Sequence, residues 1–183
     1  MQPLLILPLL AFLILLVLFA LVLRRAGRFL AQTRDVERFR RQVGDLASRV
    51  ETSLGEINSR IDAVRRGQIG ADALGDDLKA SLDAVAQYAD EARALRPPAS
   101  AAAIRDEVIG ELERTARALE MVEHGRSIQT SARLGGRELE AQTSIKRGYL
   151  NILHAREAIA HQRQVAAEPP VGEGPEPYQR RGA

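Results

Sequence analysis

Residues 3–23 read PLLILPLLAFLILLVLFALVL, a run of Leu, Ile, Val, Phe, Ala and Pro that contains no charged or polar side chain. As a helix, a run of this length extends about 32 Å, which slightly exceeds the roughly 30 Å hydrocarbon core of a bilayer. We therefore expect residues 1–23 to form a single transmembrane anchor. The rest of the chain is then a domain attached to that anchor.

The charges beside this run predict its orientation. No Lys or Arg precedes the run, whereas seven arginines follow it closely: Arg24, Arg25, Arg28, Arg34, Arg38, Arg40 and Arg41. The positive-inside rule places that flank in the cytoplasm and the N-terminus outside. We expect Arg24, Arg25 and Arg28 to contact anionic lipid headgroups.

A cleaved signal peptide is the alternative interpretation of this N-terminus. Such a peptide usually has a charged start, a shorter apolar core and a small-x-small cleavage site, and residues 1–23 have none of these. The strong preference for Arg over Lys is typical of a GC-rich bacterial genome. We therefore expect a single-pass protein of a bacterial inner membrane, with its domain in the cytoplasm.

The composition predicts an all-α domain. Aromatic residues make up only 4% of the chain, and there is no Trp and no Cys. Few aromatic residues together with abundant Ala, Leu, Arg and Glu are typical of packed helices. The absence of cysteine excludes disulfides, a thiol nucleophile and a thiolate metal site.

A heptad pattern over residues 24–66 predicts a long helix that begins with the basic juxtamembrane region. An apolar residue recurs at every seventh position: Phe29, Val36, Val43, Val50, Ile57 and Val64. Phe39 and Leu46 add a second apolar position in each heptad, and Leu54 and Ile61 shift it by one residue. This broad stripe favours a helix of an antiparallel bundle over a strict two-stranded coiled coil.

Glycine and proline divide the remainder of the chain. The glycines in residues 67–70 predict a break, and a second helix is expected over 71–95, ended by Pro97 and Pro98. Residues 99–166 should form a third and a fourth helical segment, with Ser100 as N-cap. Gly135 and Gly136 predict a turn or kink between them, and one uninterrupted helix is the alternative. Residues 167–183 are rich in Pro and Gly and are expected to be a disordered tail.

The last helix carries the most specific packing pattern. Two heptad series alternate along one seam, a small one of Ala141, Gly148 and Ala155 and a large one of Ile145, Ile152 and Ile159. Small side chains let a neighbouring helix approach closely. This seam is therefore expected either to pack inside the protein or to dock another chain.

The histidines do not indicate a metal site. His154 and His161 lie seven residues apart with Glu157 between them, and Glu120 and His124 have i,i+4 spacing, as in metal-binding bundles. If the isoleucines face the core, however, His154 and His161 fall on the solvent side. The chain also lacks a phosphate-binding loop, a His-Glu-x-x-His motif and a Gly-x-Ser-x-Gly elbow. We expect no metal, no cofactor, no catalysis and no small-molecule substrate.

The sequence therefore predicts a non-enzymatic scaffold or adaptor, anchored in the membrane and acting on the cytoplasmic side through helix–helix contacts. Its expected partners are the lipid bilayer and either another protein or a second copy of the chain. One alternative is a structural subunit exported to the envelope. The other is a membrane-tethered nucleic-acid binder, suggested by the isoelectric point of about 9.4. Nucleic acid is not favoured, because no aromatic platform accompanies the arginines.

Overall fold

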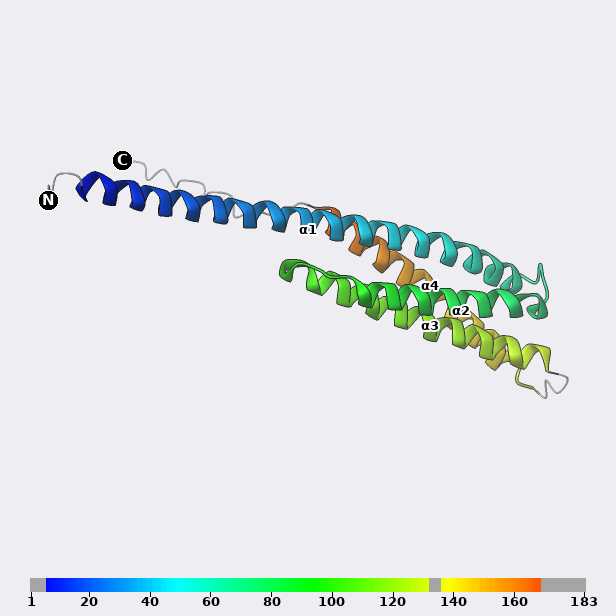
Figure 1. The fold of residues 1–183 in the computed structure, drawn as a ribbon. Coiled ribbons are helices and arrows are strands. Elements are labelled where there is room, and N and C mark those ends of the chain that lie inside the picture. The colour runs from blue at the N-terminus through cyan, green and yellow to red at the C-terminus, as the bar shows by residue number, and fades with distance from the viewer. Residues whose placement is uncertain (1–5, 132–135, 169–183) are drawn as a thin grey trace, which may run out of the picture.

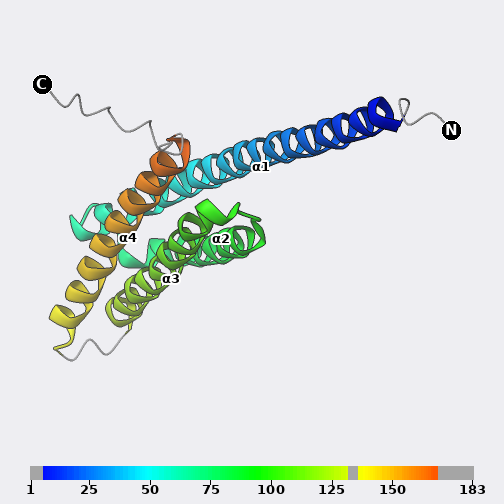
Figure 2. The ribbon, with the colours of Figure 1, turned by 90° about the vertical axis from the view of Figure 1, so that its left-hand side faces the viewer.

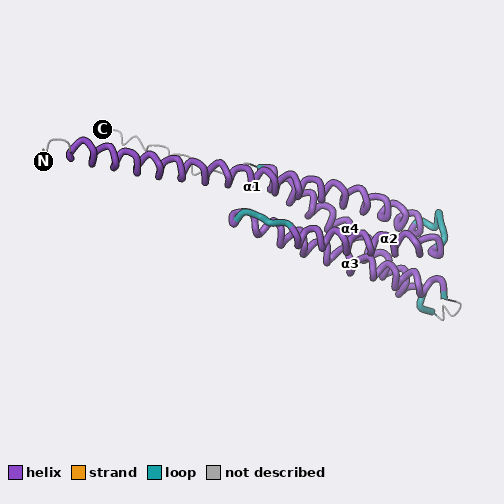
Figure 3. The backbone as a smooth tube through the Cα atoms, in the orientation of Figure 1, coloured by secondary structure: helices purple, strands orange, loops and turns teal. Residues whose placement is uncertain are grey.

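The computed structural model describes residues 6–131 and 136–168, without the side chains of residues 6–11, 14, 23 and 25–33. This part of the chain is all-α and contains no strand (Figure 3). Its four α-helices are α1 (Ile6–Arg65), α2 (Gly75–Ala94), α3 (Ala102–Thr130) and α4 (Glu138–Ala167). Two short 3-10 helices, η2 (Ala71–Leu74) and η3 (Ala99–Ala101), precede α2 and α3. The predicted all-α bundle is confirmed.

The four helices pack antiparallel to their neighbours (Figures 1 and 2). The second half of α1 packs against α2 and α4, and α3 packs against the same two helices from the other side. Short connections between consecutive helices favour this up-down-up-down arrangement. The interface between α3 and α4 is the most extensive of the four.

The heptad stripe of α1 forms one wall of the core. Val43, Val50 and Ile57 are buried, and so are Leu54 and Ile61, where the stripe shifts by one residue. The core is completed by Leu78 and Val85 of α2, Leu112 and Leu119 of α3, and Ile145, Ile152 and Ile159 of α4. Because α1 faces two helices, it needs a stripe broader than that of a two-stranded coiled coil.

The turn after α1 has a Schellman geometry. The Gly67 N–H donates to the Val64 carbonyl at 2.9 Å, and the Gln68 N–H donates to the Ala63 carbonyl at 2.8 Å. Gly67 has a φ of 70°, a conformation that costs glycine little. The second helix starts later than expected, because residues 71–74 form a 3-10 turn and the α-helix begins at Gly75.

The prediction that Ser100 caps the third helix is wrong. The chain first forms the η3 turn, the N-cap position falls on Ala101, and no side chain caps the helix. The Ala101 N–H instead donates to the Pro98 carbonyl at 2.9 Å. Pro98 sets up this turn because its ring fixes φ, and the α-helix begins after it.

The segment between α3 and α4 reverses the chain direction. α3 ends at Thr130, α4 begins at Glu138, and Gly136 has a φ of 85°. One uninterrupted helix through this region, the alternative interpretation, is therefore excluded. The tail is expected to begin at residue 167, but Ala167 still belongs to α4, and residues 169–183 lie outside the described part.

The N-terminal half of α1 extends past the other helices as an unaccompanied arm (Figures 1 and 2). Where side chains are described, no helix offers an apolar stretch long enough to cross a membrane. The first residue of α1 that is fully buried in the bundle is Phe39.

Candidate functional site

The arm of α1 exposes apolar side chains on all sides. Its described large apolar residues are each between 49% and 67% exposed: Phe12, Leu13, Leu15, Leu16, Val17, Leu18, Phe19, Leu21 and Val22. They belong to one continuous helix, and no other described helix lies beside them. A contiguous apolar surface of this kind marks a site that contacts a membrane or another protein.

The predicted lipid-contacting arginines lie where this apolar run ends. The Arg24 side chain is exposed, whereas the side chains of Arg25 and Arg28 lie outside the described part. The helix continues through this region and enters the bundle at Phe39. At the helical rise, residues 24–38 form a stalk of about 22 Å between the apolar run and the bundle.

A small separate core closes the end of the bundle from which the stalk leaves. Phe39 and Val43 of α1 pack there with Ala101 and Ala166. The Arg40 guanidinium donates to the Glu168 carbonyl at 2.5 Å and so caps the C-terminus of α4. A cation at a helix C-terminus also complements the helix dipole. These contacts join the base of the stalk to the end of α4.

The six seam residues of the last helix lie in the interior of the bundle. Ala141, Ile145, Gly148, Ile152, Ala155 and Ile159 are all buried. A Cβ built on Gly148 would lie 2.5 Å from Val122 Cγ2 and 2.6 Å from the Ala118 carbonyl oxygen. α3 thus occupies the space in which a side chain at position 148 would stand.

A second glycine makes the reciprocal contact from α3. A Cβ on Gly125 would lie 2.6 Å from Ile145 Cγ1 and 2.7 Å from the Ala141 carbonyl oxygen. Sequence reasoning missed Gly125, because the apolar stripe thins in this region. The signal was present in the spacing, since Ala118 and Gly125 are seven residues apart, like Ala141 and Gly148. The seam is therefore a two-sided contact between α3 and α4, covered within the chain.

Ion pairs join neighbouring helices at the surface. Arg49 of α1 pairs with Glu91 of α2, with 3.1 Å between Nη1 and Oε1, and Arg93 of α2 pairs with Glu113 of α3 at 2.9 Å. The hydrogen bond from Arg49 holds the pKa of Glu91 below its usual value. Exposed pairs of this kind contribute at most about 1 kcal/mol each, so they fix helix register more than stability.

The three histidines lie on the surface and do not converge. His154 and His161 of α4 are exposed. His124 approaches Glu140 of the next helix, with 3.5 Å between Nε2 and Oε1, rather than Glu120 of its own. The hydrogen bonds from Arg137, and secondarily from His124, lower the pKa of Glu140 to about 2. Within residues 6–131 and 136–168, no group of three or more acidic or histidine side chains could hold a metal ion.

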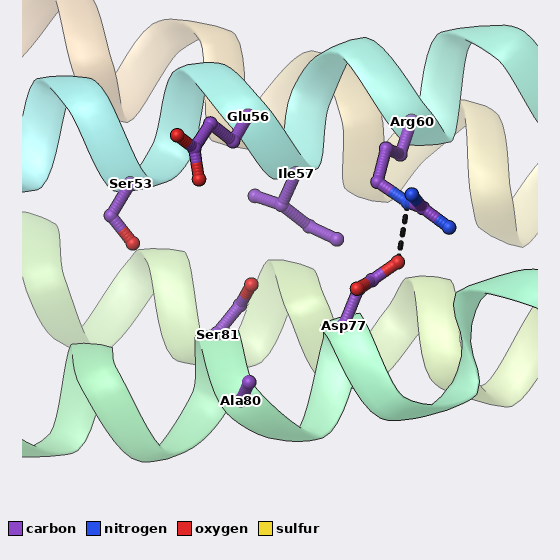
Figure 4. A pocket seen from close by; sticks show the side chains of 7 residues that line it. All are labelled: Ser53, Glu56, Ile57, Arg60, Asp77, Ala80 and Ser81. Carbon is purple, nitrogen blue, oxygen red and sulfur yellow. Dashed lines mark ion pairs between the residues drawn. The ribbon is translucent and has the colours of Figure 1, made fainter.

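A shallow pocket of about 190 Å³ lies between α1 and α2 (Figure 4). The ion pair between Arg60 and Asp77 crosses one end of it, and the Arg60 guanidinium also donates to the Ala73 carbonyl at 3.0 Å. Ser53 lies at its other end, and Ser81 lies between Ser53 and Asp77. Glu56 also lines the pocket but makes no hydrogen bond to either hydroxyl among the described residues, and Asp77 pairs with Arg60, so neither serine is seen as an activated nucleophile.

A larger pocket of about 370 Å³ lies at the far end of the bundle, between the ends of α1 and α3 and the beginning of α4.

Comparison of the chain with protein-family models, curated proteins and solved structures finds no match.

Proposed function

We propose that this protein is a non-enzymatic, membrane-anchored helical scaffold or adaptor. In this proposal residues 1–23 cross the inner membrane once, with the N-terminus outside and the bundle in the cytoplasm. The observation that carries it is the continuity of α1, which is one helix from Ile6 to Arg65. That helix joins the apolar arm to the core of the bundle.

The exposed arm supports a membrane partner. Burying one large apolar side chain is worth about 1.5–3 kcal/mol, so leaving the arm in water is strongly unfavourable. A helix that docks on a protein groove usually keeps a polar face, but the run of residues 3–23 is apolar all round. Lipid covers such a helix on every side, and the arginines after it match the flank of a membrane span.

The stalk and the bundle support a scaffold role. A helical stalk holds the bundle at a set distance from the bilayer, and Arg40 joins its base to the end of α4. The surface of the bundle is then free for contacts with other proteins. Among the described residues no group of three or more acidic or histidine side chains could hold a metal ion, and we favour binding over catalysis.

The decisive experiment measures the membrane topology by cysteine labelling, and no native cysteine is present to react with the label. Single cysteines replace Gln2, Gln68 and Ser100, the last two of which are exposed. A membrane-impermeant maleimide should label Gln2→Cys in intact cells, and should label the other two only after permeabilisation. The protein should also stay in the membrane fraction after carbonate washing.

The other outcomes separate the alternatives. Labelling of Gln68→Cys and Ser100→Cys in intact, spheroplasted cells would support the exported envelope subunit. Release by carbonate would contradict the anchor. Replacing Arg24, Arg25 and Arg28 together by Gln should increase labelling of the bundle from outside, because the orienting charge is lost. The matched control replaces three exposed arginines of the bundle by Gln and should leave the topology unchanged: Arg117, Arg147 and Arg163.

A further inference from the structure

The pocket at the far end of the bundle gathers polar groups from three helices. Its walls are formed by Val64 and Arg65 of α1, Gln129 of α3, and Gln142, Ile145 and Lys146 of α4. A volume of about 370 Å³ falls within the range of small-molecule sites. Apolar side chains line one part of it, and amides and cations line the other. This combination is typical of a site that orients a small ligand.

The charge around the pocket is positive. Asp62 is shared by two arginines, because Arg65 Nη1 lies 3.0 Å from its Oδ1 and Arg66 Nη2 lies 2.5 Å from its Oδ2. One positive charge at the end of α1 is therefore not compensated locally. Lys146 adds a second, since its ammonium pairs with no carboxylate among the described residues. No carboxylate lines the pocket itself.

The cation and the pocket rim are held in place. The Arg65 guanidinium carbon lies 4.3 Å from the centroid of the Tyr149 ring, which fixes the side chain from the α4 side. The Schellman turn at Gly67 closes α1 directly beside it. Neither Gln129 nor Gln142 uses its side-chain amide in a hydrogen bond within the described chain. Their N–H groups can therefore be donated to a ligand.

The helix dipoles leave only a small negative contribution here, about half an elementary charge. α1 and α3 end at the pocket and bring partial negative charge, whereas α4 begins beside it and brings partial positive charge. The full charges of Arg65 and Lys146 therefore decide the sign of the site. An anion is the ligand that these groups prefer.

We propose that this pocket binds a small organic anion, a phosphate or carboxylate group attached to a compact apolar body. The anionic group lies between Arg65 and Lys146, and the apolar body lies against Val64 and Ile145. A lipid headgroup of the anchoring membrane is not the ligand, because about 63 Å of helix separates Leu23 from Arg65. The pocket does not depend on the proposed anchor. It departs from the sequence-based expectation of no small-molecule substrate, which rested on motifs within single segments, whereas these residues belong to three helices.

The chain has only two lysines, Lys79 and Lys146, and this allows a direct test. Reductive methylation of the full-length protein in detergent micelles with ¹³C-formaldehyde gives a dimethylamine NMR signal for each lysine and keeps the charge. Phenyl phosphate is the probe, and inorganic phosphate and benzyl alcohol are its anionic and apolar halves. The Lys146 signal should shift and saturate with phenyl phosphate while the Lys79 signal stays in place.

The affinity pattern decides the ligand class. Phenyl phosphate should bind at least tenfold more tightly than inorganic phosphate or benzyl alcohol. Gln142→Glu, an exposed position, should weaken binding at least fivefold because it places a carboxylate in the wall. Gln87→Glu, exposed on α2 away from the pocket, should leave binding unchanged. An unshifted Lys146 signal, equal shifts of both lysines, or equal affinity for inorganic phosphate would overturn the proposal.

Discussion

Gly148 of α4 and Val122 of α3 touch so closely that a methyl group on the glycine would stand 2.5 Å from Val122 Cγ2. The Ala118 carbonyl oxygen closes the same space from the backbone side, at 2.6 Å. A side chain can rotate away from such a contact, but a helix backbone cannot. The two helices therefore depend on glycine at this position for their separation.

Gly148→Ala should destabilise the bundle by about 1–3 kcal/mol, the usual cost of overpacking a closed contact. Gly125→Ala should act in the same direction, because its Cβ would meet the Ala141 carbonyl oxygen at 2.7 Å. Thermal unfolding of the full-length protein in detergent, followed by circular dichroism, measures both. The expected result is a lower melting temperature for each variant.

Two other helical glycines serve as controls for this prediction. A Cβ at Gly44 of α1 or Gly110 of α3 would meet no atom within 4 Å. Alanine at these positions should stabilise the folded protein by up to about 1 kcal/mol, because alanine favours the helix more than glycine does and its methyl group meets no neighbouring atom. If Gly148→Ala also melted higher than the parent, the close contact between α3 and α4 would not exist in solution.

The sequence predicted the stripe of α1 well, because a heptad pattern reports directly on which face is buried. Val43, Val50 and Ile57 follow the period, and Leu54 and Ile61 are buried where the stripe shifts by one residue. The capping prediction for Ser100 failed for a local reason. The pair of prolines before it sets up a 3-10 turn, and the helix then begins without a side-chain cap.

Replacing a buried leucine by alanine should cost much more stability than replacing an exposed one. Leu112 of α3 is 0% exposed, whereas Leu139 at the start of α4 is 75% exposed. Leu112→Ala should cost about 2–5 kcal/mol, the transfer free energy plus that of the cavity left behind. Leu139→Ala should change the stability by no more than about 0.5 kcal/mol. Chemical denaturation of both variants under one condition checks the difference, and equal losses would contradict the assigned interior.

The candidate ligand pocket was beyond reach of the sequence for a different reason. Arg65, Gln129 and Lys146 belong to three helices, and nothing in their spacing along the chain relates them. Only the reversals after α1, α2 and α3 bring them to one end of the bundle. The contact between His124 and Glu140 was hidden in the same way, whereas the i,i+4 pair of Glu120 and His124 was visible and made no ion pair in the structure.

The pair of Arg49 and Glu91 should contribute little free energy despite its two-point geometry. Both side chains are well exposed, so solvent screens their attraction. A double-mutant cycle with Arg49→Gln and Glu91→Gln should give a coupling energy below about 1 kcal/mol, and the coupling should shrink in high salt. A coupling of several kcal/mol, insensitive to salt, would show that this pair is shielded from water.

Acid should weaken the bundle partly through Glu140. Arg137 and His124 hold the pKa of this carboxyl at about 2, against an unperturbed value of 4.5. A lowered folded-state pKa means that the unfolded chain takes up its proton first. The stabilising contribution of Glu140 is therefore fully present above about pH 4.5 and is lost as the pH falls toward 2. The melting temperature of the parent should fall more steeply over that range than that of Glu140→Gln.

Glu138→Gln is the matched control for the acid titration, because Glu138 is exposed on the same first turn of α4 and takes part in no ion pair of the described residues. It should retain the slope of the parent. High salt should make the pH dependence of the parent's melting temperature nearly as shallow as that of Glu140→Gln, since both partners of the ion pair are exposed. If Glu140→Gln kept the full slope of the parent at low salt, the ion pair with Arg137 would not persist in solution.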